Sequence, residues 1–180
     1  MSGTRLGVAL SLAIVAATPA SLAAQTASTD PVAAFLQHNR AEKGVTETPS
    51  GLQYKVIAPG DGGVRPSDGD VVLITYKGML TDGTTFDETA RPTPMPVAEV
   101  VPGFSEGLKL MPRGATYRFW IKPELGYGDA ATGPIPAHSI LVFDLNLLDF
   151  RSMEEIRRMQ LQMQAQQQGG TPAAPASPAP

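Results

Sequence analysis

Phe86 and the acid directly behind it, Asp87, begin the part of the sequence with the most unusual chemistry. The residues from Thr84 to Phe104 read TTFDETARPTPMPVAEVVPGF, a proline-rich run that contains no histidine, cysteine or lysine. A carboxylate with no neighbouring base has no obvious partner for proton transfer. The stretch offers an aspartate beside an aromatic ring, followed mainly by apolar surface.

Other catalytic patterns are poorly supported. Residues 126–131 (GYGDAA) match the loose G-x-G-x-x-A dinucleotide pattern, but Pro134 and Pro136 follow where that fingerprint needs a helix. His38 and His138 lie a hundred residues apart, without cysteine partners or H-E-x-x-H spacing, which disfavours zinc. No G-x-S-x-G sequence places a nucleophile. The sequence therefore predicts neither a metal nor a cofactor.

Aromatic and aliphatic residues do accumulate near predicted strand ends and loops. They are Tyr76, Phe86, Phe104, Tyr127, Ile135 and Phe143. Any one of them, taken alone, is at least as easily explained as core. Trp120 stands between Phe119 and Ile121 with no chemical context, so we interpret it as structural.

Hydrophobic periodicity predicts the elements that must position these residues. We expect helices within residues 30–44 and 103–110, and strands at 50–57, 71–80, 97–101, 115–122 and 140–150, with a further strand after the Asp82-Gly83 turn. Hairpin signals separate several strands, and the chain has room for only one crossover helix. The pattern predicts an antiparallel α+β domain.

Composition and the ends of the sequence indicate which partners and which cellular compartment to expect. The 180 residues, 42% hydrophobic, carry a net charge of −3 and no basic cluster, which disfavours nucleic acid as a partner. Arg5, an apolar run and small residues before Ala23 are typical of a signal peptide at 1–23, and no stable membrane insertion is expected. We expect a periplasmic or secreted protein, independent of redox state because it has no cysteine.

The residues after Phe150 change in character. Ser152 and Glu155 have the spacing of a capping box, which predicts a helix at 151–168 with Met153, Ile156, Met159 and Met163 near one side. Residues 169–180 are rich in proline and alanine and are expected to form a disordered tail. The helix could bind protein clients or pack on its own domain, and the sequence leaves both open.

Five segments in order resemble the FKBP-type (macrolide-binding) peptidyl-prolyl isomerase family. They are SGLQYKVI, VLITYKGMLTDGTTFD, VVPGFSEGLKLMPRG, KPELGYGD and GPIPAHSILVFDLNLL, within residues 50–150. The preceding NRAEKGVTETPSGLQY resembles the exported bacterial branch related to macrophage infectivity potentiators, which makes residues 24–49 a short helical extension. The resemblance implies an antiparallel half-barrel of five to six strands around one short helix, with short helical extensions at both ends.

The resemblance also implies which residues form the site. Catalytic positions are Asp87, Tyr127 and Phe86, and substrate-binding positions are Tyr76, Met95, Val100, Val101, Phe104, Ile135 and Phe143. Phe104 stands where many members have tryptophan, and Met95 replaces a family phenylalanine. Both changes keep the pocket apolar and bear on rate and on inhibitor affinity.

The implied activity is cis-trans isomerisation of X-Pro bonds in unfolded or partly folded exported proteins, without metal or cofactor. Tacrolimus and rapamycin are the implied macrolide inhibitors. The alternative is a periplasmic holdase or assembly factor that binds proline-containing segments with little catalysis.

Overall fold

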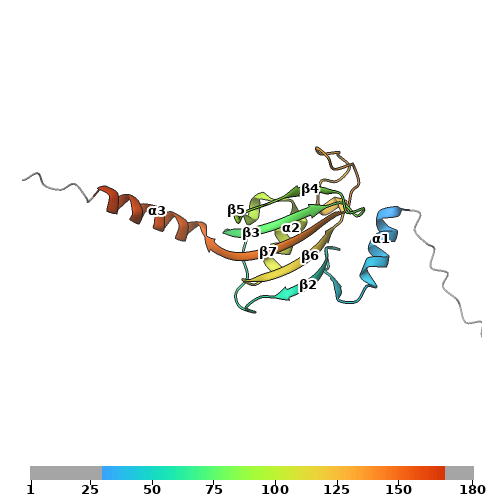
Figure 1. Cartoon of the computed structure of the whole chain (residues 1–180), viewed down its shortest axis with the longest axis horizontal. Coiled ribbons are helices and arrows are strands. Elements are labelled where there is room, and N and C mark those ends of the chain that lie inside the picture. Colours follow the sequence, from blue (N-terminus) through green and yellow to red (C-terminus); the bar gives the residue numbers. More distant parts are fainter. Residues whose placement is uncertain (1–29, 169–180) are drawn as a thin grey trace, which may run out of the picture.

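A computed structural model describes residues 30–168 of the chain (Figure 1). The expected signal peptide at 1–23 and the expected tail at 169–180 lie outside these residues. Three α-helices, α1 (Pro31–Arg40), α2 (Pro102–Leu110) and α3 (Met153–Gln168), accompany one sheet in this part of the chain. The strands are β1 (Val45–Glu47), β2 (Gln53–Pro59), β3 (Asp70–Met79), β4 (Thr85–Glu88), β5 (Thr93–Pro96), β6 (Ala115–Ile121) and β7 (Leu141–Ser152).

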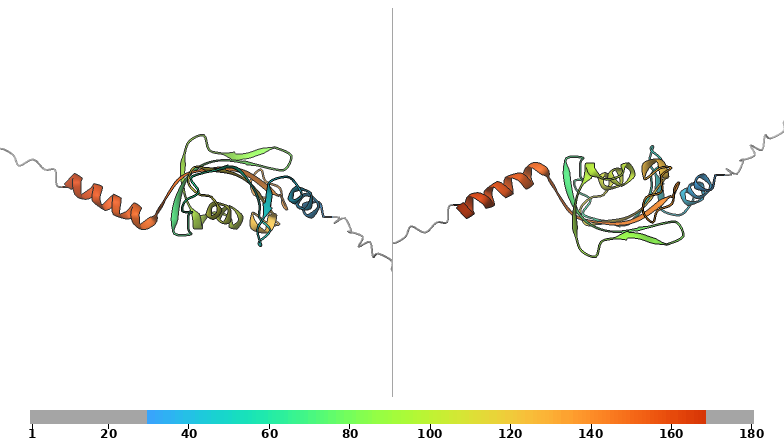
Figure 2. Two further views of the ribbon diagram at one scale, coloured as in Figure 1. Left: turned by 90° about the horizontal axis from the view of Figure 1, so that it is seen from below. Right: turned by 90° about the horizontal axis from the view of Figure 1, so that it is seen from above.

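The sheet is antiparallel and open, with the order β1-β2-β6-β7-β3-β4, and β5 also pairs with β3. β7 lies at its centre, and Phe143 is opposite Gly78 on β3 and Phe119 on β6. Register shifts interrupt the pairing of β3 with both β4 and β7, and such bulges increase local bending and twist. The sheet curves around α2 (Figure 2), which confirms the half-barrel on a short helix.

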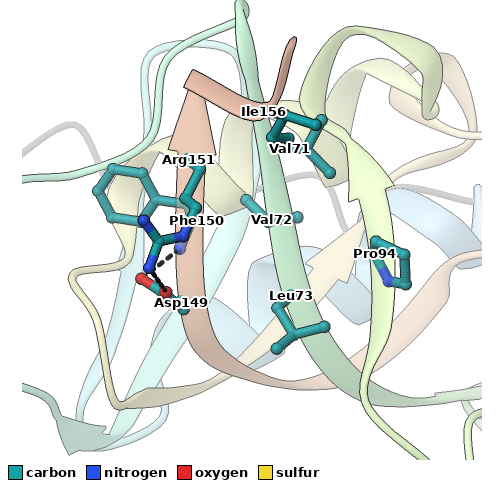
Figure 3. A pocket seen from close by; sticks show the side chains of 8 residues that line it. All are labelled: Val71, Val72, Leu73, Pro94, Asp149, Phe150, Arg151 and Ile156. Atoms are coloured by element: carbon teal, nitrogen blue, oxygen red, sulfur yellow. Dashed lines mark hydrogen bonds and ion pairs between the residues drawn. The ribbon is translucent and has the colours of Figure 1, made fainter. Parts of the chain in front are cut away.

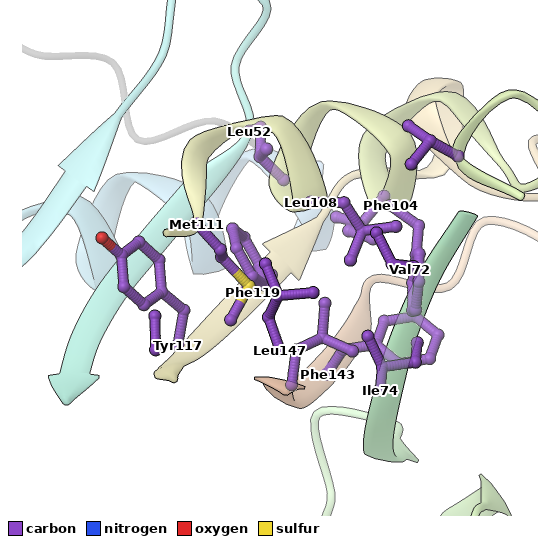
Figure 4. Packing of buried hydrophobic residues seen from close by; sticks show 14 of the residues in the cluster. Leu52, Val72, Ile74, Phe104, Leu108, Met111, Tyr117, Phe119, Phe143 and Leu147 are labelled. Atoms are coloured by element: carbon purple, nitrogen blue, oxygen red, sulfur yellow. The ribbon is translucent and has the colours of Figure 1, made fainter. Parts of the chain in front are cut away.

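The main core fills the space between the concave face of the sheet and α2 (Figure 4). Alternate residues of β7, namely Leu141, Phe143, Leu145 and Leu147, are all buried in this cluster. Side chains on one strand alternate between faces, so this period-two pattern directs one face of β7 towards α2.

α2 begins at a proline, a residue well suited to the first helical turn. Its glycines let it approach the sheet closely. A Cβ at Gly103 would lie 2.5 Å from Ile121 Cγ2, and one at Gly107 would lie 2.9 Å from Phe119 Cε1. Phe104 and Leu108, one turn apart, therefore reach the core, with exposed fractions of 4% and 0%.

α1 covers a smaller apolar cluster formed by Trp120, Ile140 and Val142. Three apolar side chains of α1 pack against it: Val32, Phe35 and Leu36. The buried Asn39 donates from Nδ2 to Gln53 Oε1 at 2.8 Å and fixes the end of the helix to β2. The interpretation of Trp120 as a structural residue agrees with this packing.

Two expectations about the strands were wrong. Residues 97–101 do not form a strand: Val97–Glu99 is a short 3-10 helix, and the strand lies earlier, at Thr93–Pro96. Pro94 and Pro96 are tolerated there because β5 pairs with β3 alone, which leaves its other side without ladder hydrogen bonds. The sheet has seven strands in the described residues rather than five or six, because the short β1 and β5 both pair into it.

α3 follows directly from β7 and extends away from the sheet (Figure 1). Its capping box forms as expected: the Glu155 N–H donates to Ser152 Oγ, and the Ser152 N–H donates to Glu155 Oε2, both at 3.1 Å. Apolar side chains stay exposed along it, including Met153 at 54% and Met163 at 55%. No helix within residues 30–168 is long and apolar enough to cross a membrane.

Candidate functional site

A cavity of about 310 Å³ lies between the start of α2 and the concave face of the sheet. Segments far apart in the sequence meet there: β3, β4, β5, the residues before α2, the loop after β6, and β7. It is lined by Tyr76, Phe86, Asp87, Met95, Glu99, Val100, Val101, Phe104, Tyr127 and Phe143. The cavity therefore collects most of the residues that the sequence nominated.

Phe143 is the centre of an aromatic wall. Its ring lies edge-on to Phe104 at 4.9 Å between centroids, to Phe86 at 5.5 Å and to Tyr76 at 6.0 Å. Edge-to-face pairs are a favoured aromatic geometry, worth roughly 0.5–1.5 kcal/mol each beyond area burial. Phe104 and Phe143 are almost fully buried, so the packing holds these rings in place without a ligand.

Gly78 on β3 makes room for this wall. A Cβ at Gly78 would lie 2.7 Å from Phe86 Cε2 and 2.9 Å from Phe143 Cε1, closer than real side chains allow. The glycine is therefore required by the neighbouring rings, because its own backbone does not adopt a positive φ.

A polar pair forms one edge of the cavity. The Tyr76 hydroxyl donates to Asp87 Oδ2 at 2.5 Å. Burial raises the pKa of Tyr76 to about 12, with further contributions from the hydrogen bond to Asp87 and from the negative charge of that carboxylate. The phenol therefore stays protonated at neutral pH and holds one oxygen of Asp87 in a fixed direction.

Two further donors belong to residues that line the cavity, and neither has a partner within residues 30–168. The Tyr127 side chain is 41% exposed, and its hydroxyl makes no hydrogen bond among residues 30–168. Val101 is the N-cap of α2; its carbonyl accepts from Phe104 N and Ser105 N, whereas its own N–H donates to no group in the described part of the chain. These donors are available to carbonyl groups of a bound ligand.

Nine of the ten nominated residues line the cavity, and Ile135 does not. Ile135 is 5% exposed and belongs to the main core. Its backbone forms an isolated antiparallel bridge with Thr132 in the same loop. Glu99 lines the cavity but was missed by the sequence analysis. The sequence pattern predicts a strand at 97–101. The structure instead has a 3-10 helix at Val97–Glu99, and the turn of this helix determines which side chains face the cavity.

A second, smaller hollow of about 180 Å³ lies near the start of α3 (Figure 3). Val71, Leu73, Pro94 and Ile156 supply apolar surface, and its charged groups are already paired, with Arg151 Nη2 3.6 Å from Asp149 Oδ2. This hollow offers no free chemical group. Residues 30–168 also contain no group of three or more His, Cys, Asp or Glu side chains that could hold a metal.

The aromatic cavity can desolvate a small apolar group and hydrogen-bond adjacent carbonyls. Its side-chain polar groups are two phenols and two carboxylates. The one hydroxyl that is hydrogen-bonded to a carboxylate is that of Tyr76, and its pKa is raised to about 12, so it is not activated as a nucleophile. Such a site is suited to binding and to conformational catalysis rather than to bond cleavage.

Comparison with known proteins gives a consistent match. Residues 62–148 match the model of the FKBP-type peptidyl-prolyl cis-trans isomerase, and residues 15–56 match the domain amino-terminal to FKBP-type peptidyl-prolyl isomerase. The FKBP-type peptidyl-prolyl cis-trans isomerase FkpA of Aeromonas hydrophila is 43% identical over 117 residues, which are 63% of this chain and 43% of the relative. The outer membrane protein MIP of Legionella longbeachae is 39% identical over 122 residues, 66% of this chain and 52% of the relative.

A solved structure is also similar. The crystal structure of a peptidyl-prolyl cis-trans isomerase from Pseudomonas syringae pv. tomato matches with a TM-score of 0.64 and 30% identity, over 67% of this chain and 91% of that one. This chain spans about half the length of the curated relatives it matches.

Proposed function

Because the chain belongs to the FKBP-type peptidyl-prolyl cis-trans isomerase family, we propose that it catalyses rotation about X-Pro bonds in exported proteins during folding. The observation that carries the proposal is the preformed aromatic cavity, lined by Tyr127 and Val101, whose hydroxyl and N–H have no partner within residues 30–168. A proline ring is a compact apolar group flanked by carbonyls, and it matches both parts of this site.

Catalysis follows from the electronic structure of the amide. Rotation is opposed by ~18–20 kcal/mol because resonance gives the planar bond partial double-bond character. Uncatalysed X-Pro exchange accordingly takes tens to hundreds of seconds. Twisting the bond removes the resonance and reduces the dipole, so a site that excludes water destabilises the planar amide more than the twisted one. Selective binding of the twisted form lowers the barrier.

Each group at the site has a role in this scheme. Phe104 and Phe143 hold the proline ring, with Phe86 closing the wall. Tyr127 and the Val101 N–H bind substrate carbonyls and fix the chain on either side of the rotating bond. Asp87, oriented by Tyr76, presents a fixed negative charge near that bond and transfers no proton.

The direct test is a protease-coupled isomerisation assay on a short X-Pro peptide, with circular dichroism showing that the protein is folded. The expected result is a cis-to-trans rate that increases linearly with protein concentration. A rate equal to that in buffer, from folded protein, would contradict the proposal.

Export is part of the proposal. The signal-peptide pattern at 1–23 supports a periplasmic or secreted protein whose substrates are unfolded or partly folded exported chains with X-Pro bonds. The same cavity is proposed to bind the macrolides tacrolimus and rapamycin. Calorimetry on the purified protein tests the macrolides, and amino-terminal sequencing of the mature protein tests cleavage near Ala23.

One observation favours a second candidate, a holdase that binds unfolded chains with little catalysis. α3 carries exposed apolar side chains on a polar helix, including Met159 at 39% and Leu161 at 58% exposure. Methionine adapts to irregular apolar partners, which suits a helix that meets many sequences. Suppression of aggregation by protein that shows no isomerase activity would favour this candidate.

A further inference from the structure

Glu99 lines the cavity, and its side chain stabilises the fold by no hydrogen bond or ion pair among the described residues. It ends the 3-10 helix Val97–Glu99, between the fully buried Val97 and the cavity-lining Val100 and Val101. Its side chain is exposed, and its carboxylate makes no hydrogen bond or ion pair within residues 30–168. Val97 is buried and Val100 and Val101 line the cavity, so the backbone of Glu99 is held at the cavity and its side chain is within reach of a bound ligand.

The charge at the cavity is of one sign. Asp87 and Glu99 are the charged residues that line it, and no lysine or arginine among the described residues does so. Asp87 already accepts a hydrogen bond from the Tyr76 hydroxyl, whereas the Glu99 carboxylate has no partner in the described part of the chain. A ligand that enters with a positive charge near its proline therefore meets attraction from two carboxylates and no opposing cation.

We propose that Glu99 is a specificity-determining residue, which favours substrates with lysine or arginine immediately before or after the proline. The inference rests on the proposed isomerase function and names the substrate class of that site. A cationic side chain beside the proline pairs with Glu99, while the proline ring enters the aromatic wall. An acidic neighbour is repelled by Glu99 and by Asp87.

The expected preference is modest because Glu99 is exposed. Exposed ion pairs are typically worth about 0.2–1 kcal/mol, which corresponds to a change of up to about fivefold in kcat/KM. At 1 M salt the Debye length falls to about 3 Å, so the preference should largely disappear there.

The test measures kcat/KM in a protease-free assay on acetylated tetrapeptide amides in two series, with the variable residue before or after proline. Each series contains lysine, its neutral analogue norleucine, and glutamate. For the wild-type protein we expect the order lysine above norleucine above glutamate in at least one series. In Glu99→Gln we expect the lysine-to-norleucine ratio in that series to fall about two- to fivefold.

Glu88→Gln is the matched control, because Glu88 is an exposed acid on β4 that does not line the cavity. Its ratios should equal those of the wild type. Wild-type protein that accelerates the peptides with no dependence on their charge, or Glu99→Gln protein with unchanged ratios in both series, would overturn the inference alone. Wild-type protein that accelerates none of the peptides would instead contradict the proposed isomerase function, and the inference with it.

Discussion

α2 and α3 are both helices of modest length, yet they stand in opposite relations to the rest of the molecule. The nine-residue α2 buries Gly103, Phe104, Gly107 and Leu108 against the sheet. The sixteen-residue α3 has no buried side chain in residues 153–166 and contacts the domain mainly where it leaves β7. The shorter helix forms a wall of the candidate site, and the longer one leaves its methionines in solvent.

The difference shows that the burial of a helix against the sheet, rather than its length, indicates whether it contributes to the candidate site. α2 supplies Phe104 to a cavity whose shape depends on rings that hold one another in place. α3 supplies an exposed apolar surface without a fixed geometry, which is suited at most to binding an apolar partner. Changes near α2 should therefore abolish structure and activity together, whereas changes in α3 should leave both nearly intact.

The largest effect is expected from Phe143→Ala. Phe143 is 6% exposed and contacts three other rings of the wall, and such truncations typically lower the free energy of unfolding by about 3–5 kcal/mol. Leu161→Ala on α3 is the matched control, because Leu161 is 58% exposed and exposed sites usually change stability by less than about 0.5 kcal/mol. Urea unfolding of both variants checks the pair, and equal losses would break the contrast.

Gly78→Ala should have the next largest effect, because the added methyl group overlaps Phe86 and Phe143. Overpacking of this kind typically lowers the free energy of unfolding by about 1–3 kcal/mol, and the displaced rings should reduce kcat/KM more than tenfold. Gly69→Ala is the control, since a Cβ there meets nothing within 4 Å and its φ is not positive. Unimpaired activity in Gly78→Ala would show that the wall tolerates movement.

A smaller effect concerns the Tyr76–Asp87 pair. Asp87→Asn removes the negative charge and weakens the hydrogen bond, so the pKa of Tyr76 should fall from about 12 while burial keeps it above its ordinary value of 10. The change is measured as the difference in tyrosinate absorbance between each protein and the same protein carrying Tyr76→Phe. This subtraction removes Tyr117, whose pKa burial also raises. Glu88→Gln should leave the pKa of Tyr76 unchanged.

The raised pKa of Tyr76 also predicts the sign of a stability change. Between about pH 10 and 12 the unfolded tyrosine loses its proton while the folded one retains it, so the free energy of unfolding falls as pH rises. The contribution is complete below pH 10 and lost above 12. Denaturant unfolding across this range should show a shallower fall in Tyr76→Phe than in the wild type, and identical slopes would contradict the assignment.

The smallest effect on catalysis is expected from removing α3. Truncation after Ser152 keeps all of β7, including its pairs with Asp70 and Val71, and should leave kcat/KM on a tetrapeptide within about twofold of the wild type. If α3 binds unfolded client proteins, the same truncation should make the protein less able to suppress their aggregation. Joint loss of stability and peptide activity would show that α3 belongs to the core and that the contrast with α2 is wrong.

Much of the fold could be predicted because local pattern and tertiary context agree. The period-two pattern around Leu145 and the helical spacing of Phe104 and Leu108 describe surfaces that the core then buries. The Ser152 capping box is purely local, so it also formed as predicted. The prediction of a strand at residues 97–101 was wrong. Their apolar, β-branched composition favours a strand, but the neighbouring β5 already pairs with the edge of β3.

The candidate site was less predictable, since a cavity depends on directions that spacing does not give. Ile135 has the composition of a lining residue but packs into the core from its loop. Glu99 has the composition of a surface acid but lies on the cavity wall, and only the turn of its 3-10 helix reveals this. The need for glycine at position 78 becomes visible only when the rings of Phe86 and Phe143 are in place.

The most direct test of the central claim follows both partners in one sample by NMR, with a labelled X-Pro peptide and labelled protein. The account predicts cis-trans exchange of the peptide that accelerates with protein concentration, together with shift changes at Tyr76, Val101, Phe104 and Tyr127 and none along α3. Phe143→Leu, which keeps an apolar side chain but removes the ring, should reduce both effects together. Exchange at the buffer rate, or acceleration with shift changes confined to α3, would contradict the claim that the aromatic cavity is the isomerase site.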